Sequence, residues 1–269
     1  MATLTSKLYP SEGFHPTSST KITLNVPYPK VLNNCTLHLH YTLPRLLFID
    51  PYELVHRKES YRFHHWGISD LEKPVHALDW GAKTEDGLAE VPGEDSEHFE
   101  QGAELLLDVT LPAVPEDVIV TSEVQVDVPM HLRYAKPLTS GALSGKESES
   151  HEAVRLNWPT AFLQCTPSST VQKLSGVSST PPSSLSKRAV SLFYSGHMPS
   201  STSVFIPISP DPLGNLQYDL VHVPLGRCED LAFVEAGTAI TVLICFFWLV
   251  RVSWRTATRL GDGARAKNE

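Results

Sequence analysis

The chain has 269 residues, a formal net charge of -8 at pH 7 and four cysteines. This acidic balance excludes a protein that holds nucleic acid or an anionic membrane surface through bulk electrostatics. About 230 residues precede a long apolar segment near the C-terminus, which is enough to bury the core of one large β domain or of two small domains.

The first predicted elements are a flexible N-terminus and a series of strands. Residues 1–20 are polar and rich in Ser and Thr, and we expect them to be frayed. Residues 21–26 alternate apolar and polar side chains as a half-buried strand does, and residues 36–43 repeat this pattern. An apolar run over 46–52 then ends in a turn. Residues 81–102 are rich in Gly, Glu and Asp, and they predict a solvated acidic loop.

Strand patterns return after this loop and continue to the apolar segment. A stretch dominated by Ser, Thr and Pro interrupts them at 166–203, and it predicts a flexible insertion because it cannot bury enough apolar surface to become ordered. No segment before the apolar stretch has a long helical period. We therefore predict a mainly β fold, with an antiparallel β-sandwich-like domain over 21–226. The further strands are expected at 103–111, 118–120, 124–128, 131–134, 154–165, 203–208 and 218–223.

The apolar segment over 231–254 predicts one transmembrane helix, because roughly 20 apolar residues cross a hydrocarbon core of about 30 Å. Basic residues dominate the tail over 255–269, whereas acidic residues dominate the flank before the helix. Since short basic flanks stay cytosolic, we expect a cytosolic tail and a β domain in the lumen or outside the cell.

The N-terminus complicates this orientation, because the first ten residues contain no apolar core of a signal peptide. Three interpretations stay open: an unusual late translocation, a missing first exon, or a tail-anchored protein with a cytosolic domain. The charge distribution favours the first two. Asn34, in Asn-Cys-Thr, is the one glycosylation acceptor and fits a lumenal domain. Because Cys245 lies in the helix, at most one intramolecular disulfide can form among Cys35, Cys165 and Cys228, and free cytosolic thiols are an equal alternative.

Residue patterns for catalysis are scarce. The chain has no G-x-S-x-G, Walker, H-E-x-x-H or C-x-x-C motif, so we predict no catalytic residue, metal or cofactor. His38 and His40 are expected on one face of a strand, with His64 nearby in sequence, and such residues can bind metal. No Cys or carboxylate stands at ligand spacing, so polar positions on a half-exposed strand are the favoured interpretation.

Two residues stand out inside the predicted transmembrane helix. Glu235 lies one turn inside the apolar segment, where a carboxylate is costly; it either reaches the headgroup layer or contacts a partner helix. Gly237 is a small residue of the kind that lets helices approach closely in lipid.

Four short segments resemble the PIG-X family in the right order along the chain. Residues 41–54 contain Leu-Phe-Ile-Asp-Pro-Tyr-Glu-Leu, similar to the family's LFxDPYEL element, and 128–134 are similar to its VPxHLRY element. Residues 157–165 resemble its CPTVFWAC element, although Asn157 replaces the first Cys. The segment 221–226, followed by one span, also matches. The absence of an obvious signal peptide resembles the fungal branch of this family.

The resemblance implies a non-catalytic subunit of glycosylphosphatidylinositol (GPI) mannosyltransferase I in the endoplasmic reticulum. Such a subunit binds and stabilises a multi-span catalytic partner of the PIG-M type, which adds the first mannose to the GPI precursor on the lumenal side. A lumenal chaperone-like module that binds several clients is the alternative. We expect the partner to contact Asp50, Glu53, Arg133, Glu235 and Gly237, although core packing explains the apolar residues around the first three equally well.

Overall fold

The computed structural model describes residues 2–24, 34–69, 101–111, 122–138, 151–168, 171, 176–194, 203–211 and 216–265. The strand expected at 118–120 and most of the acidic loop expected at 81–102 lie outside these residues; the last two loop positions begin a strand. The chain divides into two compact units, one formed by Met1–Lys136 with His151–Pro224 and the other by Pro137–Ser150 with Leu225–Glu269.

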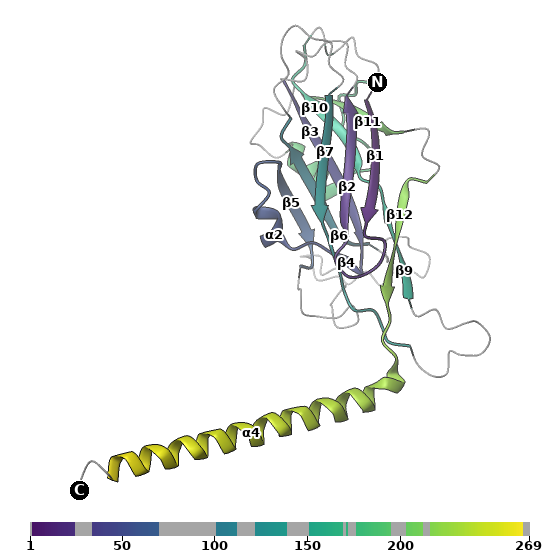
Figure 1. The fold of residues 1–269 in the computed structure, drawn as a ribbon. Helices are drawn as coiled ribbons and strands as arrows, with labels where there is room; N and C mark the ends of the chain where they lie inside the picture. Colours follow the sequence, from purple (N-terminus) through teal and green to yellow (C-terminus); the bar gives the residue numbers. More distant parts are fainter. Residues whose placement is uncertain are drawn as a thin grey trace, which may run out of the picture. The chain divides into compact units, whose positions relative to one another are not determined.

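The first unit is built on an eight-stranded sheet in the order β5-β6-β3-β10-β11-β1-β2-β7. Among the described strands of this sheet, β1 and β11 pair in parallel and the other neighbours pair antiparallel. The sheet curls, so that β1, β2 and β7 form a layer in front of β3, β6 and β10 (Figure 1). The predicted mainly β, sandwich-like fold is therefore confirmed. The strands are β1 (Ala2–Tyr9), β2 (Thr17–Leu24), β3 (Cys35–Pro44), β5 (Tyr61–Gly67), β6 (Gln101–Val109), β7 (Ser122–Pro129), β10 (Thr160–Cys165) and β11 (Val204–Pro210).

The two edges of the curled sheet approach each other. The phenol of Tyr61, on edge strand β5, donates a hydrogen bond of 3.3 Å to the carbonyl of Asp127, on edge strand β7. Two smaller sheets complete the unit: β4 (Leu47–Phe48) pairs with β8 (His131–Leu132), and β9 (His151–Asn157) pairs with β12 (Tyr218–Pro224).

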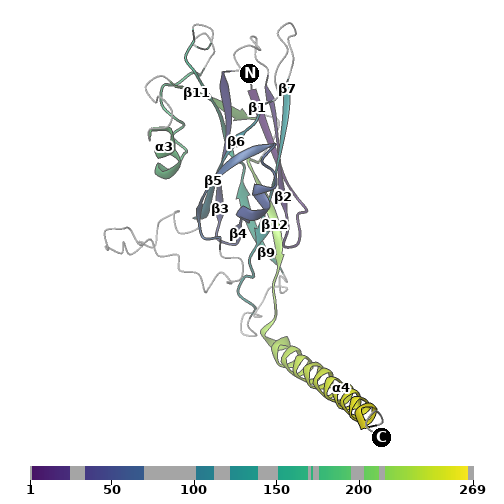
Figure 2. The ribbon, with the colours of Figure 1, turned by 90° about the vertical axis from the view of Figure 1, so that its left-hand side faces the viewer.

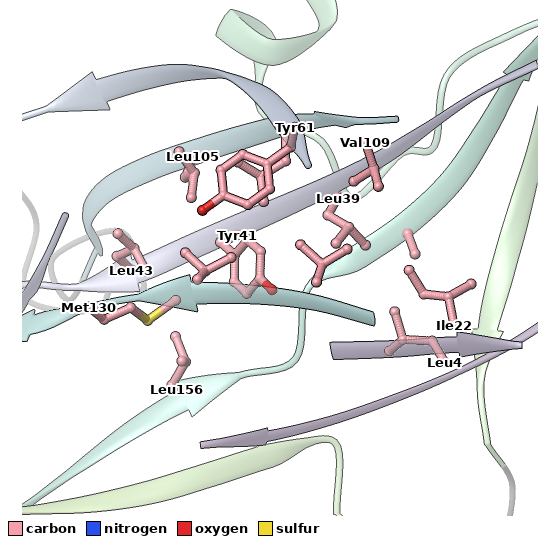
Figure 3. Packing of buried hydrophobic residues seen from close by; sticks show 14 of the residues in the cluster. Leu4, Ile22, Leu39, Tyr41, Leu43, Tyr61, Leu105, Val109, Met130 and Leu156 are labelled. Carbon is pink, nitrogen blue, oxygen red and sulfur yellow. The ribbon is translucent and has the colours of Figure 1, made fainter. Parts of the chain in front are cut away.

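The hydrophobic core lies between the two layers of the sheet, because alternate residues of each strand point inward. Leu4 and Ile22 come from one layer, and Leu39, Tyr41 and Leu105 come from the other; all five are at most 1% exposed. Figure 3 shows these side chains converging between the strands. Burial of this kind gives on the order of 25 cal/mol per Å² of apolar surface, which makes this cluster the main source of the domain's stability.

The expectation of a flexible N-terminus over 1–20 is wrong, because β1 lies between β11 and β2 inside the sheet. Its inward positions alternate Leu4, Ser6 and Leu8. The hydroxyl of Ser6 lies 2.9 Å from that of Thr20, which lies 2.9 Å from the phenol oxygen of Tyr41. Buried hydroxyls that bond one another avoid the cost of desolvation, so a Ser- and Thr-rich segment can form a central strand.

Two helices of the first unit were not predicted. The short α2 (Pro51–Val55) follows β4, and α3 (Lys187–Tyr194) lies within the stretch that the sequence predicts as a flexible insertion. Ala189 of α3 is fully buried against the sheet, and the preceding Ser178 pairs with Phe205 of β11. Figure 2 shows α3 on the outside of the layer that contains β3 and β5. This part of the insertion is thus folded, because its few apolar side chains pack onto the sheet.

The second unit contains the 3-10 turn η5 (Cys228–Asp230) and the helix α4 (Leu231–Arg265). With 35 residues, α4 is about 52 Å long at 1.5 Å per residue. It is the one helix in the described part of the chain that is long and apolar enough to cross a membrane. The helix continues past the predicted end at Trp254, so most of the basic tail extends it as regular helix.

Candidate functional site

The structure brings together the two sequence segments that carry most of the predicted contact residues. Leu47 pairs with Leu132 and Phe48 pairs with His131 in the β4–β8 sheet, and α2 follows β4 directly. We call this region, residues 47–55 and 131–134 together with His15, the α2–β8 platform.

Asp50 begins α2. Its side-chain Oδ1 accepts a hydrogen bond of 2.8 Å from the backbone N–H of Tyr52, and Pro51 occupies the first helical turn. A carboxylate that caps a helix and a proline at its start both favour this turn over an extended chain. Leu54 at the end of α2 is fully buried, so the helix is fixed at both ends.

Glu53, His131 and His15 form a chain of side chains across the platform. Nε2 of His131 lies 2.8 Å from Oε2 of Glu53, and Nδ1 of His131 lies 2.9 Å from Nδ1 of His15. The carboxylate can only accept, so Nε2 of His131 donates to it, and a neutral His131 then accepts at Nδ1 from His15. Both ring nitrogens of His131 are thus engaged, which fixes the ring and its tautomer.

Phe48 contacts both His131 and Arg133. The ring of Phe48 stacks on His131 with centroids 5.3 Å apart, and the guanidinium carbon of Arg133 lies 4.4 Å from the Phe48 centroid. Arg133 is 3% exposed, and its Nη2 donates a hydrogen bond of 3.1 Å to the carbonyl of Ile68. Of the predicted contact residues, Arg133 and Asp50 therefore hold the platform together, and the side chain of Glu53 remains 40% exposed.

Two tyrosines that the sequence did not single out are the most exposed of the platform's large hydrophobic side chains. Tyr52 is 80% exposed on α2, and Tyr134 is 71% exposed just after β8, where its ring lies 5.0 Å from that of Phe14. Tyrosine supplies a large apolar surface with a polar tip, and it is enriched among residues that dominate protein interfaces. Both lie in the two family-like segments, so the signal that could have identified them was present in the sequence.

A second group of polar residues lies on the outer face of β3 and β6. His38 and His40 share one face of β3, as the alternation predicts, and each is paired with a carboxylate of β6. Nδ1 of His38 lies 2.8 Å from Oδ1 of Asp108, whereas Nε2 of His40 lies 3.5 Å from Oε2 of Glu104. The second distance is long for a hydrogen bond, so that contact is mainly electrostatic. His64 of β5 approaches Asp108 only to 4.0 Å.

Helix α3 covers this polar group. Ser186, just before α3, donates to Glu104, and Phe193 of α3 lies 5.3 Å from the ring of His38. Burial raises the pKa of Glu104, but its interactions with His40 and Ser186 and the charge of Arg188 outweigh burial, so the pKa of Glu104 falls below its usual value. Among the described residues, no three His, Cys, Asp or Glu side chains are grouped so that they could hold a metal ion.

Cys35 and Cys165 form a disulfide between the paired strands β3 and β10. It links residues 130 positions apart and lies at the end of the sheet next to Asn34. Asn34 is exposed in the turn before β3, and its backbone carbonyl accepts from the N–H of Thr166 at 3.1 Å. Asn34 of the sequon is thus exposed, and its backbone is bonded to the chain after β10.

The two predicted contact residues of the second unit lie in the first turns of α4. Glu235 is exposed, and a Cβ added to Gly237 would meet no atom within 4 Å. Thr238 and Thr241 turn their hydroxyls back onto the carbonyls of Val234 and Gly237, each at 2.8 Å. With their hydroxyls satisfied inside the helix, these small residues leave a narrow surface that a second helix could approach closely.

The chain is similar to several fungal proteins. It is 24% identical over 241 residues to protein pbn1 of Neurospora crassa and 24% identical over 267 residues to that of Aspergillus oryzae, alignments that cover 88% and 92% of this chain. Protein PBN1 of Gibberella zeae is 25% identical over 97% of this chain. The chain spans only 40%, 41% and 45% of the length of these relatives. No solved structure matches it.

The model of the PIG-X / PBN1 family matches residues 11–254. The match includes the strands from β2 to β12, both segments of the α2–β8 platform and the apolar part of α4. The chain therefore belongs to the PIG-X / PBN1 family.

Proposed function

We propose that this chain is a non-catalytic, stabilising subunit of GPI mannosyltransferase I, the enzyme that adds the first mannose to the GPI precursor in the endoplasmic reticulum. The observation that carries the proposal is the family match. It covers both the folded β domain and the apolar part of α4. The expected partner is a multi-span mannosyltransferase of the PIG-M type. A donor and an acceptor that are both lipid-linked need an enzyme that reaches into the bilayer, and one helix cannot form such a site alone.

A lumenal position of the β domain is part of the proposal. The Cys35–Cys165 disulfide supports it, because structural disulfides persist in oxidising compartments. The exposed Asn34 sequon supports it independently, since only a lumenal Asn34 meets the glycosylation machinery. The basic residues after α4's apolar part favour a cytosolic C-terminus.

The proposed contact surface takes into account which side chains are buried and which are exposed. Asp50 and Arg133 are engaged within the α2–β8 platform, so they would act by holding it in shape. Tyr52 and Tyr134, with the part-exposed Glu53, present the surface that a lumenal loop of the partner would meet. In the membrane, Glu235 and Gly237 would meet one of the partner's helices.

Purification of the tagged full chain from detergent extracts tests the proposal. We expect the multi-span mannosyltransferase to co-purify with it. Recovery of many unrelated membrane proteins, with no preference for the mannosyltransferase, would instead support the chaperone-like alternative.

A further inference from the structure

The C-terminal half of α4 carries three arginines on one face. Arg251, Arg255 and Arg259 follow one another at four-residue intervals, so successive side chains lie about 6 Å further along the axis and are rotated by about 40°. All three are exposed. Trp248, three residues before Arg251, shares this face and is 62% exposed. We call these four residues the arginine face.

The depth of these residues matches the polar layer of a bilayer. If the hydrocarbon core takes about 20 residues from Leu231, it ends near Val250, and the headgroup layer beyond it is roughly 5–8 Å thick. Trp248 then lies at the boundary, where indole rings concentrate. Arg251 and Arg255 lie at the level of the headgroups, and Arg259 lies just beyond them.

The charges of Arg251 and Arg255 are not neutralised by their own helix. Among the described side chains of α4, Glu235 is the only carboxylate, and it lies at the other end of the apolar part. Asp262 follows Arg259 by three positions, a spacing at which opposite charges attract. Arg251 and Arg255, however, have no acidic residue within one turn on either side. A guanidinium binds phosphate through two parallel N–H groups, which makes arginine better suited than lysine to hold a phosphate in one orientation.

We propose that the arginine face is a binding site for the phosphate headgroup of an anionic phospholipid, in the leaflet where the C-terminal half of α4 emerges. Arg251 and Arg255 bind the phosphate, Arg259 adds to the local field, and Trp248 packs against the glycerol region. This site stands apart from the proposed mannosyltransferase role, because it needs no protein partner. It differs from an orientation signal, since orientation depends on the number of basic residues in the flank and not on the face they occupy.

The test uses the full chain reconstituted in phosphatidylcholine vesicles with a minor fraction of phosphatidylserine. Spin-labelled forms of both lipids report which one the protein immobilises. We expect wild type to prefer phosphatidylserine. The variant Arg255→Ala/Ala257→Arg has the same composition and net charge, but it moves one guanidinium about 200° around the helix. We expect its preference to fall about two- to five-fold, the effect of losing one exposed ion pair, because the moved guanidinium stays near the anionic surface but leaves the arginine face.

Three results would overturn the proposal. One is wild type without a preference for phosphatidylserine. Another is an undiminished preference in the swapped variant, which would mean that only the number of charges matters. The third is complete displacement of the labelled lipid by soluble glycerophosphoserine, which would identify a site for free phosphate esters rather than for lipid. Since position 257 is exposed and α4 packs no core there, the swap leaves folding unchanged.

Discussion

His131 and Glu53, 78 residues apart in the sequence, are joined by a hydrogen bond of 2.8 Å between Nε2 and Oε2. This contact ties α2 to β8 and so joins two of the four segments that resemble the family's elements. Because the hydrogen bond fixes the local surface, the side chains of Tyr52 and Tyr134 stay exposed to solvent. If the platform is an interface, its buried members and its exposed members should respond to mutation in different ways.

The exposed tyrosines should affect the partner and not the fold. We expect Tyr52→Ala/Tyr134→Ala to change the free energy of unfolding by less than about 0.5 kcal/mol per site, because exposed side chains contribute little. The same variant should lower the cellular amount of the mannosyltransferase, measured by immunoblotting. Tyr194→Ala is the matched control, since Tyr194 is 54% exposed on α3, away from the platform. Equal mannosyltransferase levels in both variants would exclude the platform as the contact surface.

Arg133 should affect the fold first. We expect Arg133→Ala to lower the free energy of unfolding by about 2–4 kcal/mol, because it removes a buried guanidinium that packs on Phe48 and bonds to Ile68. Denaturant unfolding of the full chain in detergent measures this, and Arg62→Ala, at an exposed position of β5, is the control. Wild-type stability combined with loss of the partner would show instead that Arg133 contacts the partner directly.

The disulfide should contribute a large part of the stability of the β domain. Replacement of Cys35 and Cys165 by Ser should cost about 2–5 kcal/mol, because the bond closes a long loop in the unfolded chain. Thermal unfolding with and without a reducing agent measures the same quantity. Cys228→Ser, at an exposed free thiol, should have no effect. A reduced wild-type protein that unfolds at the same temperature as the oxidised one would contradict this prediction.

Glu104 should make the domain sensitive to acid. Burial alone would raise the pKa of Glu104. The interactions with His40 and Ser186 outweigh burial, so the folded-state pKa lies below the unfolded value of 4.5. A carboxyl with a lowered folded-state pKa contributes stability that is complete above the unfolded pKa and is lost as the pH falls through the folded-state pKa. Glu104→Gln should therefore destabilise the protein at neutral pH, and this difference should be lost as the pH falls from 4.5 through the lower folded-state pKa. A difference that stays constant from neutral to acidic pH would rule out this ionic contribution.

The sequence predicts those strands and helices whose buried positions show as a regular pattern of apolar residues within the element itself. β3 shows this clearly, because Leu37, Leu39 and Tyr41 alternate with polar residues, and the apolar run of α4 is equally direct. The sequence does not predict β1, because its inward positions include Ser6, whose burial depends on hydroxyl partners in β2. The sequence does not predict α3 either, because its few apolar residues indicate a helix only when the sheet face against which they pack is known.

The sequence predicts which segments form the candidate site, but it does not predict the role of each residue in them. The motif-like residues around Asp50 and Arg133 were identified, yet the sequence cannot show that Arg133 turns inward and Tyr134 outward. That distinction depends on the pairing of β4 with β8, in which Phe48 pairs with His131, 83 residues further along the chain. The pairing of Cys35 with Cys165 is likewise a consequence of the register of β3 and β10.

The central claim is that this chain sustains a GPI mannosyltransferase without performing the chemistry itself. Depletion of the chain, followed by a microsomal assay of mannose transfer from dolichol-phosphate-mannose to glucosaminyl-phosphatidylinositol, tests it most directly. The account predicts that transfer falls together with the amount of the catalytic subunit, and that added wild-type chain restores both. Unchanged transfer and an unchanged amount of the catalytic subunit after depletion would contradict it.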